Sequence, residues 1–178
     1  ARSDGGSNSE ADLSSALEWL KTSGIISPDK WGNLPGGEIF TSPYNLNGVF
    51  VVDGVVGDYL CQKYGDLEQT PLTIEIADSR IKNLQCANKE LLTEFARYTS
   101  TDENSDRVGE FAIGLNFEIN KFTGNILFDE KIGGSFHMAL GAGYPETGSQ
   151  NKSRIHWDMI CDLREDSEIR RRRECSSC

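Results

Sequence analysis

Residues 133–158 read GGSFHMALGAGYPETGSQNKSRIHWD, and we expect the fold to form around them. Both histidines of the chain, His137 and His156, lie in this stretch, each within an apolar run typical of a strand. A loop rich in Gly, Pro, Asn and Ser separates the two runs and predicts a reversal of the chain. The two imidazoles and the carboxylate of Asp158 are therefore expected to meet at one point, as ligands of a divalent metal ion.

The alternation of side chains along each run separates an apolar face from a polar one. Over residues 135–141 the even positions are apolar, and His137 lies on the other face between small residues. Over residues 154–163 every second residue is apolar, and His156 and Asp158 share the opposite face. A single histidine in a strand is more often a hydrogen-bonded core residue than a ligand. Two histidines beside small residues, with a carboxylate on the same face, favour a ligand set.

Two glutamates are candidates for the missing ligands. Glu38 follows the turn-forming residues 33–37. It is either an exposed residue at the start of a strand or a carboxylate that the glycine turn presents to a pocket. Glu110 lies in an alternating pattern over residues 108–114, where it shares a face with Val108 and Ala112 and has no polar neighbour two positions away. This isolation favours a functional role for Glu110.

The combined candidates are carboxylates and imidazoles without cysteine, a set that suits Zn²⁺, Co²⁺ or Mn²⁺: Glu38, Glu110, His137, His156 and Asp158. Three carboxylates exceed what one zinc ion normally takes, so we expect two divalent ions with a bridging carboxylate and a bridging water. Such a pair acidifies the water and polarises a carbonyl, and a nearby carboxylate can serve as general base. Tyr144, in the Gly-rich loop, could donate a hydrogen bond to a tetrahedral oxyanion.

Composition disfavours several classes of partner. The chain has 178 residues and a net charge of -10 at pH 7, whereas nucleic-acid binding needs a basic surface. No apolar run approaches the roughly 18 residues of a membrane span, and residues 1–10 lack the apolar stretch of a signal peptide. The 5 cysteines are scattered and are interpreted as reduced thiols. These features predict a cytoplasmic protein with no nucleic-acid or membrane partner.

The other patterns predict an α+β fold in a single domain, with a mixed or antiparallel sheet and a few packed helices. Apolar spacing predicts one helix over residues 12–23 and another over 88–99, the second opened by Asn88. Strands are expected over residues 48–53, over 108–114, and in a hairpin formed by 72–77 and 80–85.

Six motifs occur in a recognisable order: NLPGGEIFTSP (33–43), GEFAIG (109–114), FDEK (128–131), GSFHMALG (134–141), YPETG (144–148) and NKSRIHWD (151–158). Together they resemble the aminopeptidase T / aminopeptidase S family of two-metal, thermophilic-type aminopeptidases, often called leucyl aminopeptidases. The resemblance covers roughly residues 20–165.

This resemblance implies that the five candidate residues ligate two divalent ions (Zn, Co or Mn), that Glu110 and Tyr144 act in catalysis, and that Glu130 is a further candidate ligand. The implied reaction releases N-terminal amino acids from peptide substrates by means of a metal-activated water, and the implied assembly is a homodimer. The alternative is a non-catalytic metal-binding or oligomerisation domain derived from such an enzyme.

The resemblance also sets the expected domain boundaries. Residues 11–165 would form the metallo-aminopeptidase domain, preceded by a disordered segment (1–10) and followed by a charged, disordered tail (166–178). Two features depart from the family. Its members usually carry an additional N-terminal α/β domain, and the Arg-rich, Cys-containing tail differs from the strand-like continuation seen in the family.

Overall fold

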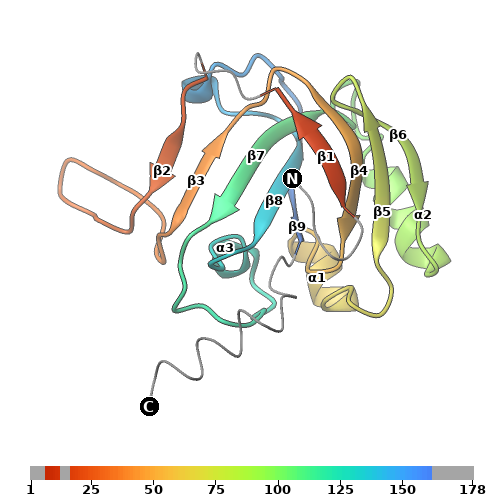
Figure 1. Cartoon of the computed structure of the whole chain (residues 1–178), viewed down its shortest axis with the longest axis horizontal. Helices are drawn as coiled ribbons and strands as arrows, with labels where there is room; N and C mark the ends of the chain where they lie inside the picture. The colour runs from red at the N-terminus through yellow and green to blue at the C-terminus, as the bar shows by residue number, and fades with distance from the viewer. Residues whose placement is uncertain (1–6, 13–16, 162–178) are drawn as a thin grey trace.

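The computed structural model describes residues 7–12 and 17–161, which form two sheets and short helices (Figure 1). The first sheet has the order β1–β4–β5–β6: β1 (Asn8–Ala11), β4 (Leu46–Val52), β5 (Leu72–Ala77) and β6 (Arg80–Gln85). The second has the order β2–β3–β7–β8–β9: β2 (Leu20–Thr22), β3 (Glu38–Thr41), β7 (Val108–Gly114), β8 (Phe136–Gly141) and β9 (His156–Cys161). The helices are α1 (Asp58–Tyr64), α2 (Lys89–Tyr98) and α3 (Ile126–Asp129), with a 3₁₀ turn over Pro145–Thr147. Neighbouring strands in both sheets are antiparallel, which confirms the predicted α+β class.

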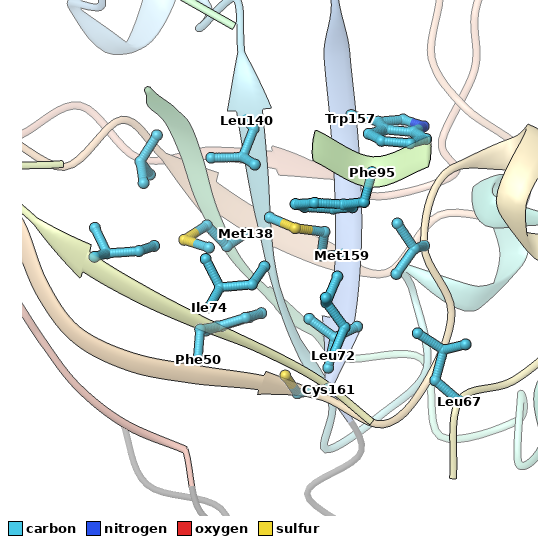
Figure 2. Packing of buried hydrophobic residues seen from close by; sticks show 14 of the residues in the cluster. Phe50, Leu67, Leu72, Ile74, Phe95, Met138, Leu140, Trp157, Met159 and Cys161 are labelled. Atoms are coloured by element: carbon cyan, nitrogen blue, oxygen red, sulfur yellow. The ribbon is translucent and has the colours of Figure 1, made fainter. Parts of the chain in front are cut away.

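A single hydrophobic cluster joins the two sheets and α2 (Figure 2). Phe50 of β4 belongs to it together with Met138 of β8 and Met159 of β9. Trp157 of β9 stacks on Phe95 of α2, with ring centroids 5.5 Å apart. Each such side chain, when fully buried, stabilises the fold by about 1.5–3 kcal/mol. Because side chains alternate along a strand, the core contacts of β8 and β9 also determine which residues appear on the opposite face of the second sheet.

Directly after β4 the chain pairs briefly with β9 of the second sheet, before it returns to the first sheet as β5. Ile160 of β9 donates its N–H to the carbonyl of Val55 at 2.9 Å, and Gly57 donates to the carbonyl of Asp158 at 2.9 Å. These backbone hydrogen bonds tie the two sheets together. It also fixes the backbone of β9 at Asp158, one of the candidate ligands.

Gly57 leaves no room for a side chain. Its φ is +45°, and a Cβ atom there would lie 1.6 Å from Nε1 of Trp157. We expect Gly57→Ala to lower the free energy of unfolding by about 3 kcal/mol, through overpacking and backbone strain, as measured by urea denaturation. Gly65→Ala is the matched control, because Gly65 has a φ of +72° but no atom within 4 Å of a Cβ. The control should lose less, about 1–2 kcal/mol from the backbone conformation alone, and equal losses would contradict the packing of Trp157 against Gly57.

Two predictions about the N-terminal region are wrong. The helix expected over residues 12–23 does not form over its second half, where Leu20–Thr22 is strand β2 and pairs with β3; residues 13–16 lie outside the described ranges. The disorder expected for residues 1–10 is contradicted in the described part of that segment, where Asn8–Ala11 form β1 and pair with β4; residues 1–6 lie outside the described ranges. In both places pairing with a neighbouring strand satisfies the backbone and overrides the local pattern.

The other predicted elements are confirmed. Asn88 caps α2 by accepting the N–H groups of Glu90 and Leu91, and the four strands predicted between residues 48 and 114 correspond to β4, β5, β6 and β7. Helices α1 and α3 were not predicted. The tail (166–178), with Cys175 and Cys178, lies outside the described residues. Within the described ranges, none of the helices has the length and apolarity needed to cross a membrane.

Candidate metal centre

Strands β7, β8 and β9 carry candidate ligands on the face of the second sheet that lies opposite the hydrophobic core. Their register aligns Glu110 of β7, Ala139 of β8 and Asp158 of β9 across three strands. Ala139 is small, so the two carboxylates can converge above it. His137 lies on the same face of β8, as the alternation predicted, and is only 1% exposed.

A β-bulge at Gly109 directs the side chain of Glu110. Between Val108 and Glu110, β7 advances by two residues while β8 advances by one. Val108 therefore packs in the core and does not share a face with Glu110, contrary to the simple alternation expected from the sequence. A Cβ atom at Gly109 would lie 2.5 Å from the carbonyl oxygen of Gly141, so glycine alone fits. Bulges often occur beside functional sites because they re-aim a side chain.

Strand β3 and the end of α3 bring a second set of polar groups to the same place. The Nζ of Lys131 donates to Oε1 of Glu38 at 2.8 Å and to Oε1 of Glu130. The hydroxyl of Thr22 also donates to Oε1 of Glu38, at 3.2 Å. The other oxygen, Oε2, lies 3.7 Å from Nε2 of His137. Glu38 is 5% exposed, so the structure agrees with the pocket alternative and not with a solvent-exposed residue.

His156 is oriented by a backbone contact. Its Nδ1 lies 2.7 Å from the carbonyl oxygen of Ala142, which can only accept, so Nδ1 carries the proton and donates it. The opposite nitrogen, Nε2, then faces Oε2 of Glu110 at 3.0 Å and Oδ1 of Asp158 at 3.6 Å. A histidine whose Nδ1–H is held by a carbonyl presents Nε2 as a metal ligand.

The pKa values of these groups report an excess of buried negative charge. Burial raises the pKa of Glu110, and burial together with Asp158 and Glu38 raises the pKa of Glu130 to about 8. Burial alone would lower the pKa of His156, but its contacts with Asp158 and Glu110 raise it to about 11. Without a metal ion, the buried negative charge thus favours bound protons on Glu130 and His156. A divalent cation would replace those protons.

We therefore expect cation binding at pH 7 to release protons. His156 and Glu130 have raised pKa values, so both hold a proton at pH 7, and a ligand must give its proton up. Affinity for Mn²⁺ should consequently increase as the pH rises from about 6 to 8. Calorimetric titrations in two buffers of different ionisation enthalpy measure the number of protons released. Identical enthalpies in the two buffers would contradict the expectation.

Three buried atoms have no hydrogen-bond partner within the described part of the chain: Glu38 Oε2, His137 Nδ1 and Asp158 Oδ1. Buried polar atoms are nearly always paired, so each of these needs an explanation. Carboxylate oxygens only accept, and a bound cation would satisfy them. The residues present therefore fit a divalent metal ion.

The candidate ligands fall into two groups that share one histidine. Glu38, Glu130 and His137 offer ligand atoms that all lie within 4.8 Å of one another, and so do Glu110, His137 and Asp158. Glu110 also links the histidines, since Oε1 lies 3.9 Å from Nε2 of His137 while Oε2 contacts His156. A carboxylate with two divergent oxygens can serve two cations at once. His137 faces both groups through the same Nε2, which has one lone pair and would ligate one of the two ions.

Tyr144 lies at the more open side of this cluster. Its ring packs against His156 and Phe40, with centroid separations of 5.2 Å and 5.0 Å. Burial, together with the carboxylates of Glu110 and Asp158, raises the pKa of Tyr144. Its hydroxyl therefore stays protonated and able to donate a hydrogen bond. Tyr144 is 39% exposed, whereas Glu110 is 3% exposed, so a molecule from solvent would approach past the tyrosine.

Comparison with known proteins identifies a family for the chain. The sequence profile of the thermophilic metalloprotease (M29) family matches residues 7–171. The chain belongs to this family. No curated protein matches it in sequence.

Two solved structures share the metalloprotease fold described above. Wild-type AmpT from Thermus thermophilus superposes with a TM-score of 0.65 at 20% identity, over 86% of this chain and 41% of that one. A 2,5-dihydroxypyridine dioxygenase from Pseudomonas putida superposes with a TM-score of 0.69 at 22% identity, over 89% of this chain and 48% of that one. At such identities the likeness concerns the fold. This chain spans less than half the length of either protein.

All the residues predicted from sequence for the metal site lie in one cluster, but three of its contacts were missed. Lys131 could have been suspected from its place in the FDEK motif, directly after an acidic pair. Thr22 was assigned to a helix that does not form, so its contact with Glu38 was hidden. The carbonyl of Ala142, which orients His156, leaves no signal in a sequence. Every residue offers a backbone carbonyl, and only the folded conformation brings this one to His156.

Proposed function

We propose that this chain carries the metal centre of a metal-dependent aminopeptidase that releases N-terminal amino acids from peptides. The observation that carries the proposal is the buried convergence of carboxylates and imidazoles around unpaired acceptor atoms, in a chain of the thermophilic metalloprotease family. The ligands that we propose are Glu38, Glu110, His137, His156 and Asp158, with Glu130 as a further candidate beside Lys131.

The protein's own groups account for the proposed proton transfers. Two divalent ions (Zn, Co or Mn), when bound, would supply a Lewis acid for the scissile carbonyl and an acidified water. Glu110 is buried within the cluster, where its carboxylate would take a proton from the attacking water and pass it to the leaving amine. The hydroxyl of Tyr144 would donate to the oxyanion that develops on the carbonyl. The products are a free amino acid and a peptide shortened by one residue.

The preference for a free N-terminus belongs to this proposal through the family resemblance. Glu38, Glu110, Glu130 and Asp158 converge in one place, and among the described residues the ammonium of Lys131 contacts two of them, Glu38 and Glu130. Two divalent ions would balance the charge of the four carboxylates, so charge alone does not select the α-ammonium of a peptide. A homodimer and a metallo-aminopeptidase domain that ends at residue 165 belong to the same proposal and rest on the family resemblance. A cytoplasmic location belongs to it through the composition. The domain start proposed from the sequence at residue 11 moves to include β1, which begins at Asn8.

The shared fold raises a second candidate, a mononuclear iron site. His137, His156 and Asp158 alone would make the two-histidine, one-carboxylate set that binds Fe(II) in oxygenases, and one structural neighbour is a dioxygenase. The environment of Glu38 and Glu110 argues against an iron site. Both are buried, and Glu38 has an oxygen without a partner among the described residues, which a single ion on the other three ligands would leave unsatisfied.

The test is hydrolysis of leucyl-p-nitroanilide by this chain after treatment with a chelator, with and without added Co²⁺ or Zn²⁺. The proposal predicts no turnover without metal and restored turnover with it. Acetyl-leucyl-p-nitroanilide, which lacks the free ammonium, should be cleaved far more slowly. Faster cleavage of the blocked substrate would point to a different amidohydrolase, and metal binding without turnover of either would support the non-catalytic alternative.

A further inference from the structure

Lys131 has an unusual environment for a lysine. Its side chain has no exposed surface, and its Nζ contacts Glu38 Oε1 and Glu130 Oε1. Lysine is almost never fully buried unless it is paired. Here the pairing places a permanent positive charge inside a cluster whose other members would bind cations.

This charge is located on one side of the centre. Its two partners belong to the ligand group formed by Glu38, Glu130 and His137. The ion pairs of Lys131 within the described residues do not include Glu110 or Asp158, and its ammonium reaches Asp158 only through a longer-range attraction. Once cations have replaced the protons on His156 and Glu130, the ammonium remains, and the two ligand groups then differ by this one positive charge.

The ammonium also limits the number of oxygens available for a metal ion. It contacts Oε1 of Glu38, and Thr22 donates to the same atom. Only Oε2 of Glu38, which has no hydrogen-bond partner in the described ranges, remains directed toward His137. The contact thus selects one oxygen of Glu38 for a cation and keeps the carboxylate in place when no cation is bound.

We propose that Lys131 is a positioning residue that acts as a resident cation: it holds Glu38 and Glu130 in place and makes their side of the centre the weaker of two divalent-cation sites. This inference rests on the metal-binding part of the proposed function and is independent of peptide cleavage. It predicts that the chain binds Mn²⁺ in two steps, first at the Glu110 and Asp158 side and then, more weakly, at the Lys131 side.

The test is calorimetric titration of the metal-free chain with Mn²⁺, together with thermal unfolding with and without the ion. In Lys131→Met, the second Mn²⁺ should bind at least about tenfold more tightly, because a buried like charge near the ion has been removed. The variant should also be less stable than the wild type without metal and should gain more stability from Mn²⁺. A damaged site would weaken binding, so the direction of the change separates the proposed role from a merely structural one.

A second lysine in the chain provides the matched control. Lys63 lies on the surface, and its Nζ also contacts two glutamates, Glu90 at 2.7 Å and Glu94 at 2.8 Å. Lys63→Met makes the same change in charge and should leave both Mn²⁺ affinities unchanged.

Glu130→Gln provides an independent test from the acidic side. It should weaken the second site and spare the first, because it removes a carboxylate that would be ionised beside the bound cation on the Lys131 side alone.

The outcomes are distinguishable from failure of the proposed function. Absence of Mn²⁺ binding by the wild type would overturn the metal centre itself. Two ions bound by the wild type, with equal or weaker second-site binding in Lys131→Met, would overturn only the role of Lys131. A Lys131→Met chain that stays unfolded in saturating Mn²⁺ would overturn it as well, because a divalent ion should take the place of the ammonium.

Discussion

Replacement of Glu110 by glutamine is expected to lower kcat/KM for leucyl-p-nitroanilide by roughly 10²–10⁴-fold, the usual contribution of a general base. The amide keeps the shape of the side chain but can neither accept a proton nor offer two anionic oxygens. Glu110 contacts His156 at 3.0 Å through one oxygen and lies 3.9 Å from His137 through the other, so the change removes charge from the middle of the centre. The measurement is steady-state hydrolysis at saturating Co²⁺.

Glu75→Gln is the matched control for this substitution. Glu75 lies on β5 in the first sheet with its side chain exposed, so the same chemical change occurs in a strand without touching the cluster. Its kcat/KM should equal that of the wild type. Wild-type activity in Glu110→Gln would contradict the assignment of Glu110 as a catalytic residue.

Replacement of His137 by alanine is expected to have the largest effect on metal binding. His137 is the one residue shared by the two ligand groups found in the described part of the chain. Its loss should weaken the ion that it ligates by more than roughly 100-fold, since even the loss of groups that merely support a ligand costs 10–100-fold. Unchanged affinity for both ions would contradict the assignment of His137 as a ligand.

Folding must be checked separately in this variant, because His137 is 1% exposed and its removal leaves a cavity. Near-UV circular dichroism reports the packing of Trp157 and Phe95 in the core on the other face of the sheet. We expect this signal to be retained in His137→Ala. His156→Ala is a useful comparison, because the candidate ligands that His156 contacts in the described structure, Glu110 and Asp158, belong to one group, so its loss should affect one ion more than the other.

The faces of β8 and β9 could be predicted because their period is two. One face of each strand had to be apolar to meet the core, which left His137, His156 and Asp158 together on the other. The candidate ligands could be named for the same reason: polar side chains are conspicuous in apolar, strand-like runs.

The remaining features depend on contacts between distant segments. At the Gly109 bulge, β7 has one residue more than β8 between two neighbouring cross-strand pairs. This extra residue places Val108 in the core. Residues 20–22 have helical spacing but become the edge strand β2 because β3 offers hydrogen-bond partners. Lys131 binds Glu38 across 93 positions of sequence, which no local pattern reports.

The most direct test of the account is the metal content of the purified chain after reloading and desalting, measured by native mass spectrometry with Zn²⁺, Co²⁺ and Mn²⁺ in turn. The arrangement of Glu38, Glu110, His137, His156 and Asp158 predicts two divalent ions per chain. A chain that binds none of the three ions would contradict the metal centre, and a chain that binds only one at saturation would contradict its dinuclear form.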